Sequence, residues 1–485
     1  MDFLSIEFAA FLCVAAVLNY VLPKHLRGVG LLLCSMFFYY FGVKQYVLLV
    51  AAICLITYFF GWLIEKHKNP FLYALAVCAV LVPLLYFKYF QFALDLVKRF
   101  LELQGNISFA DLIAPLGISF MSFQAVSYLG DIYYGKIAAE KNPIPVALQI
   151  CFFPNVTSGP IQKAKNFIPQ IKEKAVFEYE LVKHGLLLIV YGGLQKFYIS
   201  DKLAPMISNM QNEFLQSDAH GGFHFLFFAA AYAIYIYSNF NSYSDMAIGI
   251  AEVLGIRFTE NFKRPYLSQS IKEFWQRWHI SLNSWFVDYV YIPLGGSRKG
   301  KLRYYLNIAV VFFLSGLWHG ASVHFIAWGL LNAAYQIAGN LTCGIREKIY
   351  QKLRIDTKSG IIVFWKRCCV FYLIAISWLF FAMPGTRMAV KMTISMLLPS
   401  VLTLFDGWIF SQFESVMVAI TLLGTVLCFA FLQVKREKMS VSKVIQSAPV
   451  VIRYGIYAVA VAMLLFGFFG TFTGAGNGGF VYGDF

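Results

Sequence analysis

Charged side chains are scarce in this 485-residue sequence: Asp, Glu, Lys and Arg together make up 13%, against 59% hydrophobic residues. Because a soluble domain is typically about a quarter charged, this composition excludes a soluble globular protein. The 49 Phe and 29 Tyr residues fit helices in lipid, since aromatic side chains gather at both membrane interfaces. The sequence therefore predicts an all-α polytopic membrane protein inserted in a lipid bilayer.

Acidic residues are fewer than basic ones, and the net charge is +15. The Lys and Arg residues cluster between apolar runs, as is typical of cytoplasmic loops that follow the positive-inside rule. No basic patch belongs to a soluble module, so binding to nucleic acid is excluded. The clusters are Lys24 and Arg27, Lys66 and Lys68, 163–174, 263–303, 346–366 and 435–443.

Metal-ligand spacings are also missing. The nine cysteines are scattered, most of them inside apolar runs, and no His, Asp or Glu cluster has the spacing of a metal site. We therefore expect no metal ion, no disulfide and no permanently bound cofactor. The absence of a Gly-x-Ser-x-Gly motif excludes the nucleophile elbow of α/β-hydrolases. The amino terminus lacks a positive n-region, so we expect a retained first span with its amino terminus outside.

Hydrophobic windows that could cross a core of ~30 Å, which takes about 20 residues, recur along the chain. They predict about eleven or twelve crossings. We expect one integral membrane domain over 1–485, with N-terminal helices in 1–105, a catalytic core in 106–340 and C-terminal helices in 341–485. The windows are 3–23, 28–43, 45–63, 71–97, 184–201, 222–241, 303–318, 321–340, 361–383, 388–405, 415–434 and 450–472.

The middle third is interrupted by polar residues. In 109–169 and again in 241–300, apolar residues alternate with Gly, Pro, Ser, Asn and charged residues. Irregular segments of this kind cannot face lipid, so they must be buried in protein or line a cavity. The outer thirds thus predict a helical wall, and the centre predicts the functional site.

One ionisable residue, His319, lies inside an apolar stretch, in the sequence Ser315-Gly-Leu-Trp-His-Gly-Ala-Ser322. A polar group at hydrocarbon depth is costly unless it is paired or faces a water-filled cavity. Imidazole is the side chain best suited to proton transfer near neutral pH. A working site is therefore the favoured interpretation, and a helix-packing histidine bonded to nearby backbone is the alternative.

A second histidine, His279, follows a helix start. Ser270-x-x-Glu273 is a capping box, which predicts a helix from Ile271 to Pro293 with its Trp, Leu and Tyr residues on one face. His279 falls at the margin of that aromatic stripe. An interfacial helix with Trp anchors at headgroup level is an equally good description. Beyond it, the Gly295–Lys301 loop carries Arg298 and Lys299, which are candidates for phosphate contact, although a solvated turn explains them as well.

Several motifs in this chain resemble the membrane-bound O-acyltransferase family, and within it the bacterial alginate O-acetyltransferase branch more than the teichoic-acid D-alanylation branch. The similarity covers at least 110–340, and the joint order of the motifs makes it specific. The motifs are Phe153-Pro154 with Gly159-Pro160-Ile161, Tyr243-Ser-Asp-Met-Ala-Ile-Gly249, Glu260-Asn-Phe-Lys-Arg-Pro-Tyr266, Glu273-Phe-Trp-Gln-Arg-Trp-His-Ile-Ser-Leu282, Asp288-Tyr-Val-Tyr-Ile-Pro-Leu-Gly-Gly296 and Gly316-Leu-Trp-His-Gly320.

The resemblance implies helices ringing a thinned centre, with an acyl donor entering from the cytoplasm and an acceptor hydroxyl approaching from outside. By matching motif, His319 is the essential histidine and His279 the second functional one. It further implies acetyl-CoA as donor, a secreted or cell-wall polysaccharide as acceptor, and an SGNH-hydrolase-like partner outside the bacterial cell membrane. Asn239 and Ser242 depart from the Asp and Gly common in the family, as does Asn-Val-Thr-Ser after Pro154, which suggests altered acceptor or partner preference.

Acyl transfer from a thioester to an alcohol needs a base on the hydroxyl and stabilisation of an oxyanion. We expect His319 to be that base, with His279 orienting or polarising the reacting group or sharing its proton. A covalent acyl-His319 carrier remains an alternative. Substrate-binding or tunnel-lining positions are expected at Trp318, Asn283, Trp285, Asp288, Tyr243 and Asp245.

Two other functions compete with this one. A polysaccharide or solute transporter would also have broken helices and a central polar site, but the two halves show no paired Gly/Pro interruptions. Transfer of D-alanine from a carrier protein to teichoic acid would use similar chemistry. A non-catalytic scaffold fits the histidine motifs least well.

Overall fold

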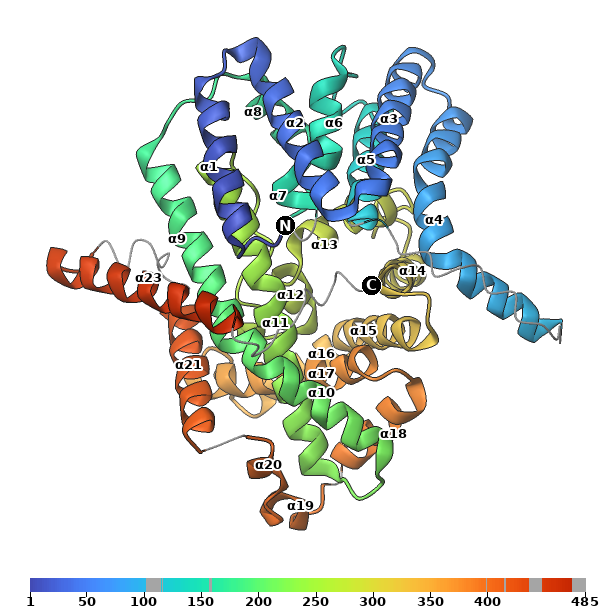
Figure 1. Ribbon diagram of the computed structural model, residues 1–485. Coiled ribbons are helices and arrows are strands. Elements are labelled where there is room, and N and C mark those ends of the chain that lie inside the picture. The colour runs from blue at the N-terminus through green and yellow to red at the C-terminus, as the bar shows by residue number, and fades with distance from the viewer. Residues whose placement is uncertain are drawn as a thin grey trace. The chain divides into compact units, whose positions relative to one another are not determined.

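The computed structural model describes residues 1–101, 115, 117–156, 159–397, 399–413, 416–435 and 447–472, and these are helical without any strand (Figure 1). Each hydrophobic window of the sequence contains a helix, so the all-α expectation is confirmed. These helices are α1 (Ile6–Val21), α2 (Lys24–Val43), α3 (Val47–His67), α4 (Pro70–Phe100), α9 (Tyr179–Gln195), α11 (Gly222–Val253), α14 (Lys301–His319), α15 (Val323–Leu341), α17 (Gly360–Ala382), α18 (Thr386–Leu397), α21 (Val416–Lys435) and α23 (Val450–Phe472).

Five stretches of the described helices are long and apolar enough to cross a membrane, which makes this a multi-pass membrane protein. Shorter apolar helices are Ile6–Val21, Pro143–Val156 and Met417–Phe431. The expected total of eleven or twelve crossings stays a prediction, because the other windows contain helices that are shorter or more polar. The five are Val47–His67, Pro70–Leu94, Gly222–Val253, Gly360–Ala382 and Val450–Gly467.

The middle third mixes buried helices with irregular backbone: residues 134–142 and 254–264 are not helical, as expected, whereas two other parts are regular helices. Helix α11 continues through Asp245 to Val253, and helix α5 (Ile118–Tyr133) is buried at every residue from Ile118 to Ile132. Polar groups inside the protein explain the pattern: Gln149 Nε2, for example, donates to the Gln162 carbonyl at 2.6 Å. Residues 109–114 and 157–158 lie outside the described residues. The remaining short helices are α6 (Pro143–Cys151), α7 (Phe153–Val156), α8 (Ala164–Lys172), α12 (Ile271–Arg277) and α13 (Ile280–Phe286).

The chain forms two compact units, and the predicted division at 105 and 340 stays a prediction. Unit 1 comprises 1–189, 243–260 and 284–289, and unit 2 comprises 190–242, 261–283 and 290–485. In unit 1, α3, α4 and α6 pack around the buried α5. Unit 2 contains α10 (Asp201–Gln216), most of α11 and the helices from α14 onward.

Arg27 of unit 1 corrects the expectation that its basic cluster is a solvated loop. Its side chain is only 2% exposed. The guanidinium donates to Asn19 Oδ1 at 2.8 Å and to the carbonyls of Gln170 and Glu173 at 2.6 and 2.7 Å. Asn19 in turn donates to the Leu254 carbonyl at 2.9 Å. A buried charge is tolerated only with such partners, so Arg27 joins α1, α2 and the C-terminal end of α8.

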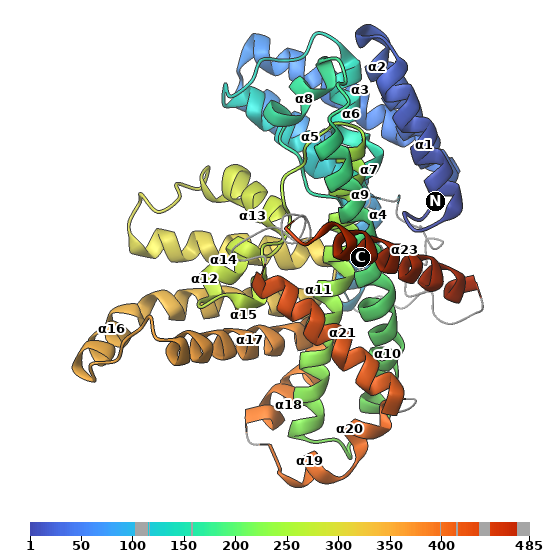
Figure 2. The same ribbon diagram turned by 90° about the vertical axis from the view of Figure 1, so that its left-hand side faces the viewer.

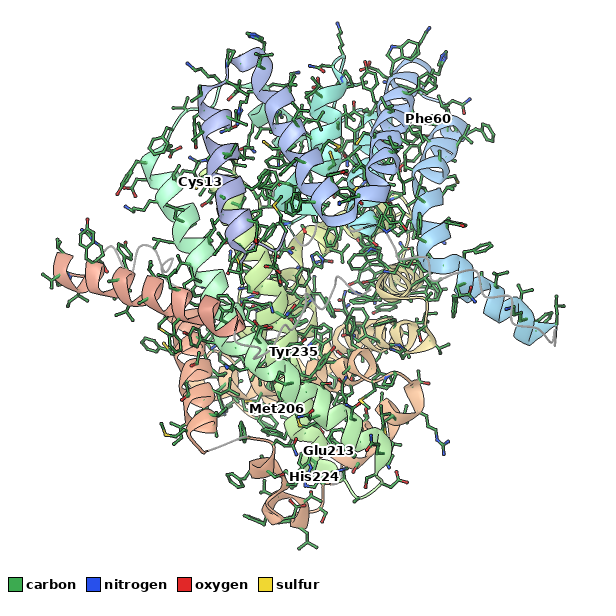
Figure 3. All side chains as sticks on the ribbon, viewed as in Figure 1. Cys13, Phe60, Met206, Glu213, His224 and Tyr235 are labelled. Carbon is green, nitrogen blue, oxygen red and sulfur yellow. The ribbon has the colours of Figure 1, made fainter. Side chains whose placement is uncertain are left out.

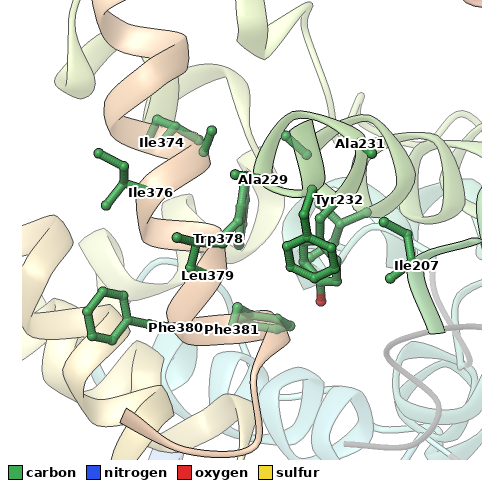
Figure 4. Packing of buried hydrophobic residues seen from close by; sticks show 14 of the residues in the cluster. Ile207, Ala229, Ala231, Tyr232, Ile374, Ile376, Trp378, Leu379, Phe380 and Phe381 are labelled. Carbon is green, nitrogen blue, oxygen red and sulfur yellow. The ribbon is translucent and has the colours of Figure 1, made fainter. Parts of the chain in front are cut away.

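The core of unit 2 is an aromatic-rich cluster between α10, α11, α15 and α17. Figure 4 shows Trp378, Leu379 and Phe381 of α17 beside Tyr232 of α11 and Ile207 of α10. Burying a large apolar side chain contributes about 1.5–3 kcal/mol. The cluster therefore holds α17 against α15, and the two helices lie side by side in Figure 2.

Helices α14 and α15 form a tight hairpin in unit 2, and glycines allow their close approach. A Cβ at Gly316 would lie 2.3 Å from the Phe325 carbonyl oxygen, and one at Gly329 would lie 2.2 Å from that of Phe312. Small residues at helix interfaces let backbones pack closely where lipid offers no hydrophobic driving force. His319 is the last residue of α14, so this hairpin sets its position.

Candidate active site

His319 is buried in an aromatic pocket of unit 2, with 4% of its surface exposed. Its ring centroid lies 4.6 Å from that of Trp318, 5.0 Å from Trp328 and 5.0 Å from Phe381, in edge-on arrangements. These rings come from α14, α15 and α17. Aromatic walls exclude water, and this strengthens any hydrogen bond or charge interaction made at the imidazole.

His279 lies between α12 and α13, where the two short helices meet. Ser270 caps α12, as the capping box predicts, with its Oγ accepting from the Glu273 N–H at 3.1 Å. However, α12 ends at Arg277, and His279 adopts a left-handed backbone with φ of +44°. The prediction of one continuous helix with an aromatic face is therefore wrong. Trp278 is 2% exposed, so headgroup anchoring is also wrong for this residue.

The structure brings the two histidines to one tryptophan. The Trp318 ring centroid lies 6.2 Å from that of His279 and 4.6 Å from that of His319. Phe240 meets the His279 ring edge-on at 4.7 Å. All four residues belong to unit 2. The structure thus places the two histidines of the recognised motifs next to the same buried ring.

Burial lowers the pKa of His279 to about 3, because a charged ring loses its hydration there. The ring is 3% exposed. Its Nδ1 lies 3.0 Å from Asn261 Oδ1. His279 is therefore a neutral imidazole at neutral pH, and it can offer one nitrogen with a proton and one with a lone pair.

A left-handed backbone at a non-glycine residue costs about 1–2 kcal/mol. We therefore predict that His279→Gly is more stable than His279→Ala by about 1 kcal/mol, while both lose the imidazole and most activity. Thermal unfolding of both variants in one detergent measures the difference.

Lys272 is the matched control for that pair, because it is exposed and helical in α12. There the order should reverse, since glycine is about 1 kcal/mol worse than alanine inside a helix. Equal stability of the two His279 variants would mean that the left-handed conformation carries no strain.

The other expected lining residues divide between the units. Asn283 of unit 2 donates from Nδ2 to the Trp275 carbonyl at 2.8 Å. In unit 1, Trp285 stacks on Phe123 at 4.1 Å and Asp288 pairs with Lys163 at 2.6 Å. Tyr243, also in unit 1, donates from its hydroxyl to Asp2 at 3.2 Å, and Asp245 is buried there. Their roles in substrate binding stay predictions.

The Gly295–Lys301 loop uses three of its backbone N–H groups for its own turn. Its N–H groups at Gly295, Gly296 and Arg298 bond to carbonyls of Ile292, Tyr291 and Gly295. Backbone donors of the loop are thus used in the turn itself. The side chains of Arg298 and Lys299 are exposed, so a phosphate contact through these two cations stays a prediction.

Three further histidines have structural partners. His184 Nδ1 lies 2.6 Å from Glu252 Oε2 in unit 1, and His324 Nδ1 lies 3.0 Å from the Phe380 carbonyl in unit 2. His224 bonds to Asp406 at 2.9 Å. Its ring packs on Trp408, whose Nε1 donates to Glu213 at 2.8 Å. Figure 3 labels His224 and Glu213. These contacts support packing roles. Within the described residues no group of three or more His, Cys, Asp or Glu side chains could hold a metal ion.

Sequence reasoning missed the residues that hold the histidines. Trp328 and Phe381 reach His319 from two other helices, and no local pattern marks them. Asn261 was inside a recognised motif, but its pairing with His279 bridges a separation of 18 residues. The signal that could have found this pair is the side-chain amide of Asn261, because a polar residue in a buried segment needs a hydrogen-bond partner.

The described helices thus form a multi-pass membrane protein with two buried histidines next to one tryptophan. Residues 138–388 match the family model described as MBOAT, the membrane-bound O-acyltransferase family. The chain belongs to this family and is an O-acyltransferase.

Named relatives agree with that assignment. The chain is 33% identical to "Probable alginate O-acetylase AlgI" of Pseudomonas putida over 79% of its own length and 77% of that protein. It is 32% identical to the "Peptidoglycan O-acetyltransferase" of Helicobacter pylori over 68% of this chain and 67% of that protein. It is 29% identical to the "Teichoic acid D-alanyltransferase" of Bacillus subtilis over 60% and 75%.

Proposed function

We propose that this protein moves an acetyl group from acetyl-CoA, on the cytoplasmic side of a bacterial cell membrane, to a polysaccharide hydroxyl on the other side. One observation carries the proposal: His319 and His279 meet at Trp318, inside the segment that matches the acyltransferase family. The names of the alginate and peptidoglycan relatives support acetyl as the group and a polysaccharide as the acceptor.

His319 acts as general base. It takes the proton of the acceptor hydroxyl as the oxygen attacks the thioester carbonyl carbon, so that a C–O bond forms and the C–S bond breaks. The proton then passes to the thiolate of CoA, and the imidazole returns to its neutral form. General-base assistance of this kind contributes roughly 10²–10⁴-fold to the rate.

The other residues named from the motifs serve the substrates. Trp318, Asn283, Trp285, Asp288, Tyr243 and Asp245 bind substrate or line its path, and the Arg298 and Lys299 side chains contact the donor phosphates. An SGNH-hydrolase-like protein outside the membrane receives the acetyl group when transfer to the polysaccharide is indirect.

The direct test uses purified protein in vesicles that contain alginate or peptidoglycan fragments, with acetyl-CoA labelled in the acetyl group added outside. Label should appear on the enclosed polysaccharide only in vesicles with the protein. Adding a secreted SGNH-type partner to the lumen should raise the yield if a relay operates.

Two other results would overturn the proposal. Label transfer only from a D-alanyl carrier protein to teichoic acid would select the D-alanylation reaction. Passage of a labelled solute into the lumen, without acylation, would select a transporter.

A further inference from the structure

The amide of Asn261 has an orientation that its neighbours determine. Its Oδ1 accepts from the Ser281 hydroxyl at 2.9 Å and from the Ser281 backbone N–H at 3.4 Å. A backbone N–H can only donate. The atom facing Ser281 must therefore be the amide oxygen and not the amide nitrogen. Hydrogen-bond partners are the usual basis for this assignment.

The same oxygen faces His279. Its distance from His279 Nδ1 is 3.0 Å, and both side chains are buried. Because an amide oxygen only accepts, Nδ1 must carry the proton in this contact. In a neutral imidazole the lone pair then belongs to Nε2.

The backbone holds this geometry in place. The Asn261 carbonyl accepts from the Ile280 N–H at 2.8 Å, and the Arg277 carbonyl accepts from the Lys263 N–H at 2.8 Å. These two bonds pair residues 261–263 with 277–280 on both sides of the helix break. Residues 261–263, which lie outside α12 and α13, thus support the left-handed conformation of His279. Strained functional residues are usually held by surrounding structure in this way.

We propose that Asn261 is a positioning residue that fixes His279 as the Nδ1–H tautomer, so that Nε2 acts only as a hydrogen-bond acceptor in the transfer reaction. This inference rests on the proposed function. It narrows the role of His279: a ring whose Nε2 carries the lone pair cannot donate to the oxyanion. His279 accepts a hydrogen bond from the attacking hydroxyl and orients it, while His319 takes the proton.

The geometry agrees with the charge state of the ring. Burial holds the pKa of His279 far below neutrality, so a doubly protonated ring does not compete. A wrong tautomer at a catalytic histidine is costly: loss of the orienting partner lowers kcat about 10⁴-fold in a serine protease triad. A weaker effect of roughly 10–100-fold is expected here, by analogy with outer partners of histidine ligands.

The test compares Asn261→Ala and Asn261→Asp in the full-length protein. Nitrogen-15 NMR of labelled histidine, with His279 assigned from the spectrum of His279→Gln, reads the tautomer without any activity assay. We expect Nδ1–H in the unmodified protein and in Asn261→Asp, whose carboxyl oxygen accepts the same proton. In Asn261→Ala we expect the Nε2–H form to appear and kcat to fall 10–100-fold with KM nearly constant.

Asn332→Ala is the matched control, since Asn332 is a buried asparagine of unit 2 that donates to the Trp328 carbonyl within its own helix. It should change stability without changing the His279 tautomer. An Nε2–H ring in the unmodified protein overturns the inference, as does an Asn261→Ala variant with an unchanged tautomer and kcat. If Asn261→Ala does not fold, the other two spectra still decide. A protein with the expected tautomer but no acetyl transfer contradicts the proposed function alone.

Discussion

Replacing His319 by alanine is expected to lower acetyl transfer by about 10²- to 10⁴-fold, because the general base is lost. The ring is surrounded by Trp318, Trp328 and Phe381, which already fill the pocket with aromatic contacts. The variant should still fold and insert. Transfer of labelled acetyl across vesicle membranes measures the loss, and gel filtration in detergent checks the fold.

His324→Ala is the control for this substitution. His324 is five residues further along, is partly buried, and bonds to the Phe380 carbonyl instead of contacting Trp318. It should retain most activity. A His319→Ala enzyme with near-normal transfer would refute the assignment. Mass analysis of acid-quenched enzyme separates general-base catalysis from a covalent acyl-histidine, because only the latter adds an acetyl mass to the His319 peptide.

Gly329→Ala is expected to have the second large effect, through the α14–α15 hairpin. The added Cβ would lie 2.2 Å from the Phe312 carbonyl oxygen and 3.1 Å from its carbon, so the helices must separate. Overpacking of this kind costs about 1–3 kcal/mol. Because His319 ends α14, the separation should also lower transfer activity. Unfolding temperature and activity of the purified variant measure both effects.

Gly339 provides the comparison in the same helix. Nothing lies within 4 Å of a Cβ built there. Gly339→Ala should therefore be neutral or stabilise the helix by up to about 1 kcal/mol. If the two alanine variants prove equally stable, close backbone packing does not hold the hairpin together.

Most helices follow from the sequence because hydrophobic length is a local property. The boundary between the windows 303–318 and 321–340 falls at His319, where α14 ends in the structure. The start of α12 was equally predictable from the sequence, since a capping box involves only four consecutive residues. Such signals need no knowledge of the rest of the fold.

The helix break at His279 could not be predicted from local sequence. No Gly or Pro occurs between Ile271 and Tyr289, and the end of α12 depends on backbone bonds from Asn261 and Lys263. These bonds are long-range, so they are invisible to helical periodicity. Polar residues in the middle third misled in the opposite direction for α5: they suggested irregular backbone, whereas Ile118–Tyr133 is a helix, in which Ser127 donates to the Gln124 carbonyl and Asp131 accepts from the Tyr289 hydroxyl.

The candidate site was predictable to the extent that motifs identify residue types. His319 and His279 were named from the sequence, and Trp318 with them. Their shared contact came only from the fold, since α14 and the α12–α13 junction are joined by tertiary packing. The rings of Trp328 and Phe381 belong to two later helices, α15 and α17, and no local pattern marks them.

The buried Arg27 has a consequence for how this protein is made. Its acceptors at Gln170 and Glu173 are translated about 140 residues later, and Leu254, which anchors Asn19, later still. During synthesis the Arg27 guanidinium therefore has Asn19 as its acceptor before the two backbone carbonyls exist. The bonds that join α1 and α2 to the rest of unit 1 are therefore completed only after more than half of the polypeptide has been made.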